Sequence, residues 1–284
     1  RLQGDWSSDV CSSDLATPVS NPRYPVVLAF SGHDPSGGAG IQADIEAAAA
    51  QGCAAATVVT CLTVQDTTNV RRLLPVAADT VEQQARTLLA DVPVKAIKIG
   101  LLGDASVAGA ISAVLRDHPG IPLVLDPVLA AGGGAELAGP ALLQTVRDDL
   151  LGQSTLVTPN SEEARRLSEG RTLDQCAGLL LDQGCGAVLI TGGHEPGANV
   201  TNHLYRPAMA TLSSHWPRLP GSYHGSGCTL ASSIAALLAC GHDVETAVRQ
   251  GQDYTWQTLA HGWQAGAGQL LPDRLFACRP GARV

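Results

Sequence analysis

The stretch PVVLAFSGHDPSGGAGIQADIEAAAAQGCAAATVVTCL, residues 25–62, contains a complete unit of strand, loop, helix and strand. Its opening residues form an apolar run, which predicts a buried strand. A glycine-rich loop follows over 31–40, and the alanine-rich residues 41–51 predict a helix that Gly52 ends. Residues 53–62 are apolar and β-branched, which predicts a second buried strand. Such a unit is typical of proteins in which helices cover a mainly parallel sheet.

The alternation of strand-like and helix-like segments continues through most of the chain. Further strands are expected at 94–99, 122–125, 154–157 and 187–190, and a weak alternation over 199–215 indicates antiparallel strands. Helices are expected at 79–91, capped by Asp79, at 104–117, begun by Asp104, and at 138–150, 161–168, 172–183, 224–239 and 244–259. The sequence therefore predicts an α/β fold with one domain over 16–284, in which helices cover both faces of the sheet.

The composition excludes several classes of protein. The net charge is −8 and aromatic residues make up 4%, and neither value is typical of a chain that binds nucleic acid. No uninterrupted apolar run of about eighteen residues occurs, so no membrane span is expected. The only lysines are Lys95 and Lys98, and neither follows a glycine-rich loop, which excludes a P-loop.

The cysteines and the amino-terminal segment bear on the compartment and on the start of the fold. The 8 cysteines include no C-x-x-C motif and no paired spacing suited to zinc, and no secretory signal is recognisable. This pattern fits a reducing compartment, and we expect a cytoplasmic location. Residues 1–15 have no apolar period and contain Ser-Ser-Asp twice, so we interpret them as a non-native or disordered tail.

Polar and glycine-rich segments follow the predicted strands. In a parallel sheet the carboxyl ends of the strands lie along one edge, and ligands bind beyond that edge. The segments are 31–40, 63–69, 100–104, 126–134, 158–163 and 191–197. We therefore expect the functional site at the carboxyl edge of the sheet.

The most informative loop is Gly225-Ser-Gly-Cys228, which leads directly into a predicted helix. Its flexible backbone and the free amides of the helix start form a ready site for an anion, such as a phosphoryl group in transfer. Cys228 would lie in the first turn, where a helix end stabilises a thiolate. Taken alone, the stretch is equally well explained as a tight turn with a buried cysteine.

Other strand-end loops carry further candidates. The loop 31–40 has glycines at 32, 37, 38 and 40 and lacks the G-x-G-x-x-G pattern, which disfavours a dehydrogenase. Asp126 ends a strand, and Asn160 and Glu163 follow the next one at a spacing that places both on one helix face. Such residues are candidates for holding magnesium, largely through water. The more frequent role for an asparagine at this place is that of a helix N-cap.

Five motifs in order resemble one known family. They are Asp-Pro-Ser-Gly-Gly-Ala-Gly-Ile-Gln-Ala-Asp (34–44), Val-Leu-Asp-Pro-Val (124–128), Thr-Pro-Asn-x-x-Glu (158–163), Thr-Gly-Gly-His (191–194) and His-Gly-Ser-Gly-Cys-Thr-Leu (224–230). Together they resemble the hydroxymethylpyrimidine/phosphomethylpyrimidine kinases of thiamine biosynthesis, within the ribokinase-like superfamily. Each motif is loose by itself, but five in order are specific. The resemblance covers roughly residues 25–275.

The resemblance implies a fold and a reaction. The fold would be a ribokinase-like three-layer α/β/α sandwich with a central, mainly parallel sheet, usually a homodimer. Such enzymes use ATP and Mg²⁺ to phosphorylate the small molecule 4-amino-5-hydroxymethyl-2-methylpyrimidine on its hydroxymethyl oxygen. They then phosphorylate the monophosphate to the pyrophosphate.

The resemblance also implies roles for individual residues. Gly225, Ser226 and Gly227 would form the anion hole, and Cys228 would deprotonate or orient the substrate hydroxyl. Substrate-binding positions would be Gly32, Asp44 and Gln65, of which Gln65 would read the pyrimidine edge through its amide. The nucleotide would be bound by Asn160, Thr191, Gly192 and Gly193, and magnesium by Asp126 and Glu163.

The sequence also departs from the family pattern. Thr191 stands where many members carry lysine, Ala131–Gly134 where many carry lysine or threonine before Ser-Gly, and Asp66 where many carry asparagine. Phosphate charge would then be neutralised by magnesium, backbone amides and arginine. We expect His33 and His224, which flank the proposed site, to have structural or binding roles.

Two alternatives stay open at the level of the sequence. A pyridoxal or pyridoxine kinase of the same fold would share the Gly-Ser-Gly loop but normally carries aspartate at position 228. A non-catalytic pyrimidine-binding sensor would keep the fold, although the intact loop at 225–228 disfavours it.

Overall fold

The computed structural model describes residues 23–279, so the interpretation of residues 1–15 concerns a segment outside the described part. The described chain forms one nine-stranded sheet in the order β3-β2-β1-β4-β5-β6-β7-β8-β9. Neighbours among β1, β2, β4, β5, β6 and β7 pair in parallel, whereas β3, β8 and β9 join antiparallel. The strands are β1 (Val26–His33), β2 (Ala54–Gln65), β3 (Val70–Pro75), β4 (Val94–Ile99), β5 (Leu123–Leu125), β6 (Leu156–Val157), β7 (Val188–Ile190), β8 (Asn199–Tyr205) and β9 (Leu212–Pro217).

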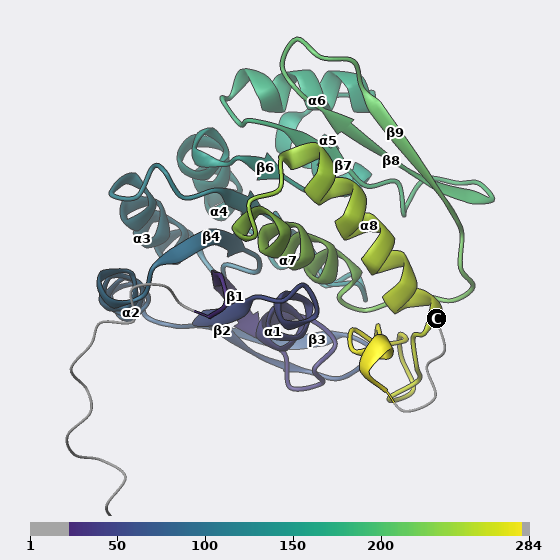
Figure 1. The fold of residues 1–284 in the computed structure, drawn as a ribbon, viewed down its shortest axis with the longest axis horizontal. Helices are drawn as coiled ribbons and strands as arrows, with labels where there is room; N and C mark the ends of the chain where they lie inside the picture. Colours follow the sequence, from purple (N-terminus) through teal and green to yellow (C-terminus); the bar gives the residue numbers. More distant parts are fainter. Residues whose placement is uncertain (1–22, 280–284) are drawn as a thin grey trace, which may run out of the picture.

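Helices cover both faces of this sheet (Figure 1). One face packs against α1, α7 and α8, and the other against α2 to α6, each through its own apolar core. The three-layer α/β/α sandwich implied by the resemblance is therefore confirmed. The helices are α1 (Gly40–Ala50), α2 (Ala78–Asp91), α3 (Ala105–Arg116), α4 (Pro140–Thr145), α5 (Ser161–Ser168), α6 (Leu173–Asp182), α7 (Ser226–Ala239) and α8 (Val244–Ala260).

The central strands supply both cores because alternate side chains point to opposite faces. In β1, Leu28 and Phe30 pack toward α2–α6, while Val27 packs toward α1, α7 and α8. In β4, Ile97 packs toward α2–α6, and Lys98 bonds to α1 on the other side of the sheet. Burying a side chain such as Phe30, which is 0% exposed, stabilises the fold by about 1.5–3 kcal/mol.

The parallel ladder brings the strand-end loops to one edge. Just past β4 the amide of Gly100 donates to the Phe30 carbonyl (2.8 Å), and past β5 the amide of Asp126 donates to Ile99 (2.8 Å). The Thr158 amide past β6 donates to Leu125 in the same way (2.9 Å). The loops that carry the predicted site residues therefore start side by side.

Three local predictions require correction. Residues 70–75 form β3, which pairs antiparallel with β2 and was not predicted, because Arg71 and Arg72 interrupt any apolar alternation there. Asp79 does not cap α2; the N-cap is Ala77, and Asp79 lies within the first turn. The helix expected over 138–150 divides into α4, a π-helical turn (Val146–Leu150) and a 3₁₀ turn (Leu151–Gln153).

Other local predictions are confirmed. Asp104 caps α3 by accepting a hydrogen bond from the Val107 amide (2.9 Å). The weak alternation after residue 199 corresponds to the antiparallel pair β8 and β9, which extends the sheet beyond β7. Among residues 23–279, no helix combines the length and the apolarity that crossing a membrane requires.

Candidate active site

Two helix amino termini meet at the carboxyl edge of the sheet. The N-cap of α7 is Gly225, whose φ of +80° favours glycine, and a Cβ there would overlap the Gly38 carbonyl oxygen. The first residue of α1 is Gly40, whose φ is +60° and whose Cβ would overlap the Gly32 carbonyl oxygen. Only glycine therefore permits the two loops to pack so closely. Their helix starts direct free amides and partial positive charge toward one place, which suits an anion.

Cys228 lies in the first turn of α7, between these loops. The neighbouring residue Gly227 lies beside Asp126, since a Cβ there would be 3.7 Å from both carboxyl oxygens. Burial raises the pKa of Cys228 to about 12; Lys98 opposes this rise, and Asp126 and Asp44 add to it. The expected thiolate stabilisation is thus wrong, because burial outweighs the helix end. Cys228 is a protonated thiol at neutral pH.

Two enclosed carboxyl groups face this region. Asp126 follows β5, and a Cβ at Gly227 would lie 3.7 Å from both of its carboxyl oxygens. Burial raises the pKa of Asp126 to about 6 although Lys98 opposes the rise. Burial, with the charge of Asp126, raises the pKa of Glu163 to about 8. Because the charge of Asp126 disfavours ionisation of Glu163, a cation between the two carboxyl groups would relieve the repulsion.

The donor set fits magnesium only in part. Among the described residues no group of three or more histidine, cysteine, aspartate or glutamate side chains is placed to hold a metal. Magnesium is commonly held by one or two carboxylates, with water and phosphate oxygens as its other ligands. Asp126 and Glu163 supply this number of carboxylates. The chain therefore fits a magnesium ion that arrives with a polyphosphate.

A buried ion pair that the sequence analysis missed lies beneath the anion loop. Lys98 Nζ is 2.8 Å from Asp44 Oδ1 and 3.0 Å from Ser31 Oγ, and both charged side chains are almost fully buried. Ser232 of α7 donates to the same Asp44 oxygen (2.6 Å). Burial lowers the pKa of Lys98, but Asp44, Cys228 and Asp126 raise it more, so the lysine stays charged.

This pair defines the surroundings of Asp44. The carboxylate is 1% exposed, and its Oδ1 is shared by Lys98 and Ser232. Its expected role in substrate binding stays a prediction. Gly32, the neighbouring candidate, is also buried, and a Cβ there would be 2.9 Å from Cys61 Sγ. The sequence signal for the pair was a lysine within the apolar strand 94–99.

Gln65, the last residue of β2, lies within a short polar chain. His224 Nε2 is 2.8 Å from Asp34 Oδ2 and 3.1 Å from the Gln65 amide. Burial opposes ionisation of Asp34, but hydrogen bonds from His224 and Ser36 lower its pKa to about 2. The Gln65 atom that faces His224 Nε2 is its amino nitrogen, and the tautomer of the ring decides which group donates.

A narrow cavity lies beside Gln65. It is lined by the β2–β3 turn (66–69), the loop 131–133, His224 and Gln269, and its volume of about 10 Å³ holds one water molecule. Cβ atoms at Gly132 and Gly133 would lie 2.6 Å from Gln269 and 2.5 Å from the Thr68 carbonyl oxygen, respectively. The cavity is therefore too small for an aromatic ring with the loops in this arrangement.

The predicted nucleotide side is built around the end of β7. The amide of Thr191 donates to Pro159 (2.9 Å), and that of Ser161 donates to Thr191 (3.1 Å). Gly192 packs so closely on β8 that a Cβ would overlap the Thr201 carbonyl oxygen. Its amide donates to the buried side chain of Asn202 (3.0 Å). The turn is thus fixed from both sides, and Gly193 after it is exposed.

Asn160 serves as the N-cap of α5, the alternative that sequence reasoning had favoured for this residue type. Its side-chain oxygen accepts from the amides of Glu162 (3.0 Å) and Glu163 (2.9 Å). In turn, the backbone amide of Asn160 donates to Glu163 Oε2 (2.9 Å), which completes a capping box. The cap orients the Glu163 carboxyl group toward Leu129 and Asp126.

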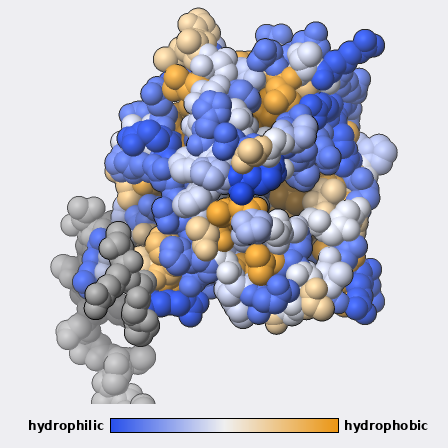
Figure 2. Space-filling model, turned by 90° about the vertical axis from the view of Figure 1, so that its right-hand side faces the viewer, coloured by the Kyte–Doolittle hydropathy of each residue, from blue (hydrophilic) through white to orange (hydrophobic). Residues whose placement is uncertain are grey.

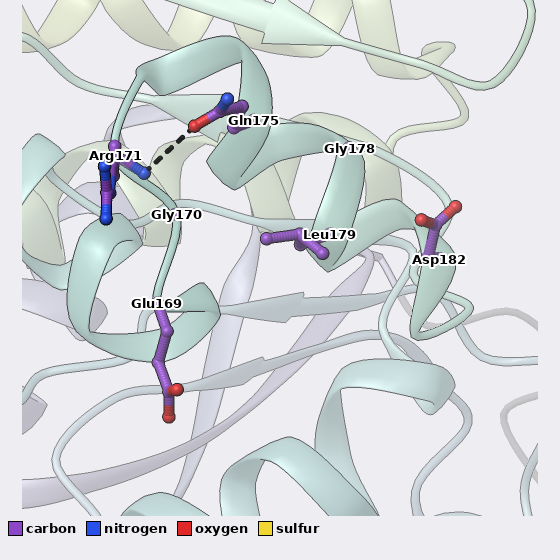
Figure 3. Close-up of a pocket in the computed structure, with 7 residues that line it drawn as sticks. All are labelled: Glu169, Gly170, Arg171, Gln175, Gly178, Leu179 and Asp182. Carbon is purple, nitrogen blue, oxygen red and sulfur yellow. Dashed lines mark hydrogen bonds between the residues drawn. The ribbon is translucent and has the colours of Figure 1, made fainter.

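One surface hollow lies away from these residues. A shallow groove of about 570 Å³ runs along α6 (Figure 3). Its charged side chains, among them Glu169 and Asp182, point outward, and the hydrogen bond from the Arg171 amide to Gln175 stays within the α6 cap. None of the predicted site residues lines it, so it is not the candidate active site.

Figure 2 shows a second hollow, on the side of the molecule that lies at the right in Figure 1. The face is mostly hydrophilic, and apolar groups surround the hollow near its centre (Figure 2). Small-molecule sites commonly take this form, with an apolar lining and a few polar groups.

Comparisons with known proteins agree with this geometry. The family model of phosphomethylpyrimidine kinase matches residues 34–273. The hydroxymethylpyrimidine/phosphomethylpyrimidine kinase of Mycobacterium tuberculosis (strain ATCC 25618 / H37Rv) is 36% identical over 269 residues, which cover 92% of this chain and 97% of the relative. The kinase of that name from Synechococcus elongatus is 34% identical over 86% of this chain and 95% of the relative.

Solved structures share the fold. The ADP complex of Bacillus subtilis pyridoxal kinase superposes with a TM-score of 0.81 at 26% identity, over 89% of this chain and 98% of that one. The phosphomethylpyrimidine kinase of Clostridium difficile 630 superposes with a TM-score of 0.73 at 28% identity, over 83% of this chain and 99% of that one. A pyridoxal kinase from Staphylococcus aureus, in complex with AMP-PCP and pyridoxal, has a TM-score of 0.79 at 26% identity, over 88% of this chain and 94% of that one.

Proposed function

Because the chain belongs to the phosphomethylpyrimidine kinase family, we propose that it phosphorylates 4-amino-5-hydroxymethyl-2-methylpyrimidine and then its monophosphate, with ATP as the phosphoryl donor. The observation that supports this most strongly is the meeting of the α7 amino terminus with Asp126. A Cβ at Gly227 would lie 3.7 Å from both carboxyl oxygens, so anion-binding amides and a proton acceptor share one place. Phosphoryl transfer to a hydroxyl requires both.

The chain's own residues would act as follows. Amides at the start of α7 and at Gly40 stabilise the charge on the transferred group. The hydroxymethyl oxygen would pass its proton to the Cys228 sulfur while the thiol proton moves to Asp126, whose carboxyl group lies beside the first turn of α7. That oxygen forms the new bond to phosphorus as the bond to ADP breaks. Magnesium, bound by Asp126 and Glu163, would neutralise phosphate charge.

Gln65 and His224 would recognise the pyrimidine. The Gln65 side chain, whose Nε2 is 3.1 Å from His224 Nε2, would donate to a ring nitrogen and accept from the exocyclic amine through its amide group. Thr191, Gly192 and Gly193 would line the nucleotide-binding side of the site.

The homodimer and the cytoplasmic location stay predictions. Light scattering on the purified protein tests the homodimer.

A coupled assay of ADP release tests the proposed function. The enzyme is offered the pyrimidine, its monophosphate and pyridoxal in separate reactions, each with MgATP. We expect turnover with the first two substrates. Absence of turnover with all three would overturn the assignment as a kinase.

The same assay tests the second candidate function. Pyridoxal phosphorylation is favoured by the pyridoxal kinases among the structural neighbours, one of which is a complex with pyridoxal. A pyridoxal kinase normally carries aspartate where this chain has Cys228, which disfavours this candidate. The ratio of kcat/KM for the pyrimidine and for pyridoxal decides between the two functions. A ratio in favour of pyridoxal would replace the proposed substrate and keep the proposed chemistry.

Gln65→Ala should raise the KM for the pyrimidine and leave the affinity for ATP nearly unchanged. The substitution leaves polar atoms of the bound ring without partners, which costs about 1–3 kcal/mol, or roughly five- to 150-fold in KM. Steady-state kinetics with each substrate varied in turn gives both values. Gln257→Ala, at an exposed position of α8, is the matched control. Equal weakening of both substrates would show that Gln65 only supports the structure.

A further inference from the structure

The carboxyl-terminal strap, residues 263–279, crosses three loops of the candidate active site. Leu270 donates to the Ser222 carbonyl and accepts from the His224 amide, at 2.9 Å each. Gln269 donates its amide to Thr67 in the β2–β3 turn (2.8 Å). The strap therefore binds the segment that leads into the anion loop on one side and the turn beside Gln65 on the other.

Arg274 extends this contact to the third loop. Its side chain is 1% exposed, which is rare for an arginine unless its donors are satisfied. Nε donates to Thr229 Oγ1 in the first turns of α7 (2.8 Å). Nη1 and Nη2 donate to the carbonyl oxygens of Gly37 (3.3 Å) and Gly38. Nη1 also reaches Glu46 of α1 (3.1 Å).

The carbonyl groups that Arg274 holds belong to the most confined part of the site. A Cβ at Gly38 would overlap the His224 ring, and a Cβ at Gly225 would overlap the Gly38 oxygen. Thr229 in turn donates to the Gly225 carbonyl (2.8 Å). A shift of the Gly38 peptide therefore displaces the N-cap of α7, from which the anion hole begins.

Glycine residues alone do not hold this arrangement. Gly37, Gly38 and Gly40 lack side chains that would restrict the backbone, and Gly37 and Gly40 have positive φ. A planar guanidinium with five donors satisfies several acceptors in fixed directions, which a lysine ammonium on its flexible stem does not do. Loss of Arg274 would leave two buried carbonyl groups and a hydroxyl without this donor.

We propose that Arg274 is a positioning residue for phosphoryl transfer, which holds the glycine-rich loop 34–40 against the amino end of α7. The expected effect of Arg274 on kcat rests on the proposed function. Its role in holding the two loops together rests on its hydrogen bonds alone. Arg274 lies just beyond residues 34–273, the stretch that the family model matches. The strap therefore adds to the site a residue that the family match does not include.

Arg274→Met tests the proposal, with Arg279→Met as the matched control. Arg279 lies on the same strap but is exposed, and within residues 23–279 it pairs with Asp273 alone (2.7 Å). Kinetics are expressed per folded enzyme, measured by near-ultraviolet circular dichroism. We expect kcat of Arg274→Met to fall by at least about tenfold, since small misplacements of catalytic groups have effects of this size. Guanidinium ion, at concentrations that do not unfold the protein, should restore part of kcat, and urea should not.

Hydrogen exchange gives a readout that does not depend on activity. In Arg274→Met the amides of residues 36–40 and 225–229 should exchange faster, while those of α3 should not change. If Arg274→Met does not fold, the same measurements are made on Arg274→Lys, which keeps the positive charge but lacks the planar guanidinium group with its several donors. Wild-type kcat per folded enzyme together with unchanged exchange would overturn the inference. An inactive wild-type protein whose variant shows faster exchange would overturn only the proposed function.

Discussion

Replacing Lys98 with methionine should lower the free energy of unfolding by about 3–5 kcal/mol, because it leaves the Asp44 carboxylate buried without a cation. Lys98 is 0% exposed, and Asp44 Oδ2 has no hydrogen-bond partner in the described structure that would compensate. Urea denaturation followed by circular dichroism measures the change. Lys95→Met is the matched control, since Lys95 lies on the same strand with its side chain exposed.

A double variant separates the charge from the packing. Lys98→Met with Asp44→Leu removes both charges, and apolar replacement of a buried pair is often neutral in stability. We expect the double variant to recover most of the loss of the single one. A single variant within about 1 kcal/mol of the wild type would contradict this account, since this is the range expected of an exposed pair.

The sequence predicted the frame of the fold because its strands are continuously apolar and its loops are glycine-rich. Residues 25–62 contain the whole pattern, and β1, α1 and β2 occur where it placed them. The placing of the loops after β5, β6 and β7 along one edge followed from the rule that parallel strands end at one edge. Asp104 was recognisable as a cap because aspartate precedes an apolar-periodic run.

The remaining features depend on contacts between distant segments, which no local pattern reveals. The partners of Lys98 come from α1 and β1, 54 and 67 residues away in the chain. The partners of Arg274 lie more than 200 residues away, apart from Thr229. Strand β3 is held by pairing with β2 and not by its own sequence, which carries two exposed arginines. The protonation of Cys228 depends likewise on burial in the assembled fold.

The charges around Cys228 explain why Lys98, which the sequence analysis did not assign to the site, belongs to it. Asp44 and Asp126 both lie within electrostatic reach of Cys228, and each opposes the development of negative charge on its sulfur. Lys98 is the neighbouring charge with the largest effect, and it favours negative charge on the sulfur. Of the two lysines in the sequence, Lys98 is therefore buried beneath the anion loop, where its side chain is 0% exposed.

Replacing Cys228 with alanine should lower kcat by at least about a hundredfold, with little change in the affinity for ATP. A positioned group that transfers a proton contributes about 10²–10⁴-fold in rate. Alanine removes the sulfur that links the substrate hydroxyl to Asp126 but keeps the helix start and its amides. The measurement is turnover at saturating pyrimidine and MgATP, with Cys278→Ala, an exposed cysteine, as the control. Cys228→Asp should recover part of the rate, because a carboxylate also accepts a proton.

The state of the thiol gives an independent check on this prediction. Since burial raises the pKa of Cys228 to about 12, the thiolate is a small fraction at neutral pH, and only the thiolate is alkylated. Inactivation by iodoacetamide should be slow at pH 7 and should accelerate by about tenfold for each pH unit up to pH 9. Bound pyrimidine with MgATP should protect the enzyme. If Cys228→Ala instead turns over within a fewfold of the wild type, the thiol only fills the first turn of α7, and catalysis then rests on phosphate positioning alone or on His224.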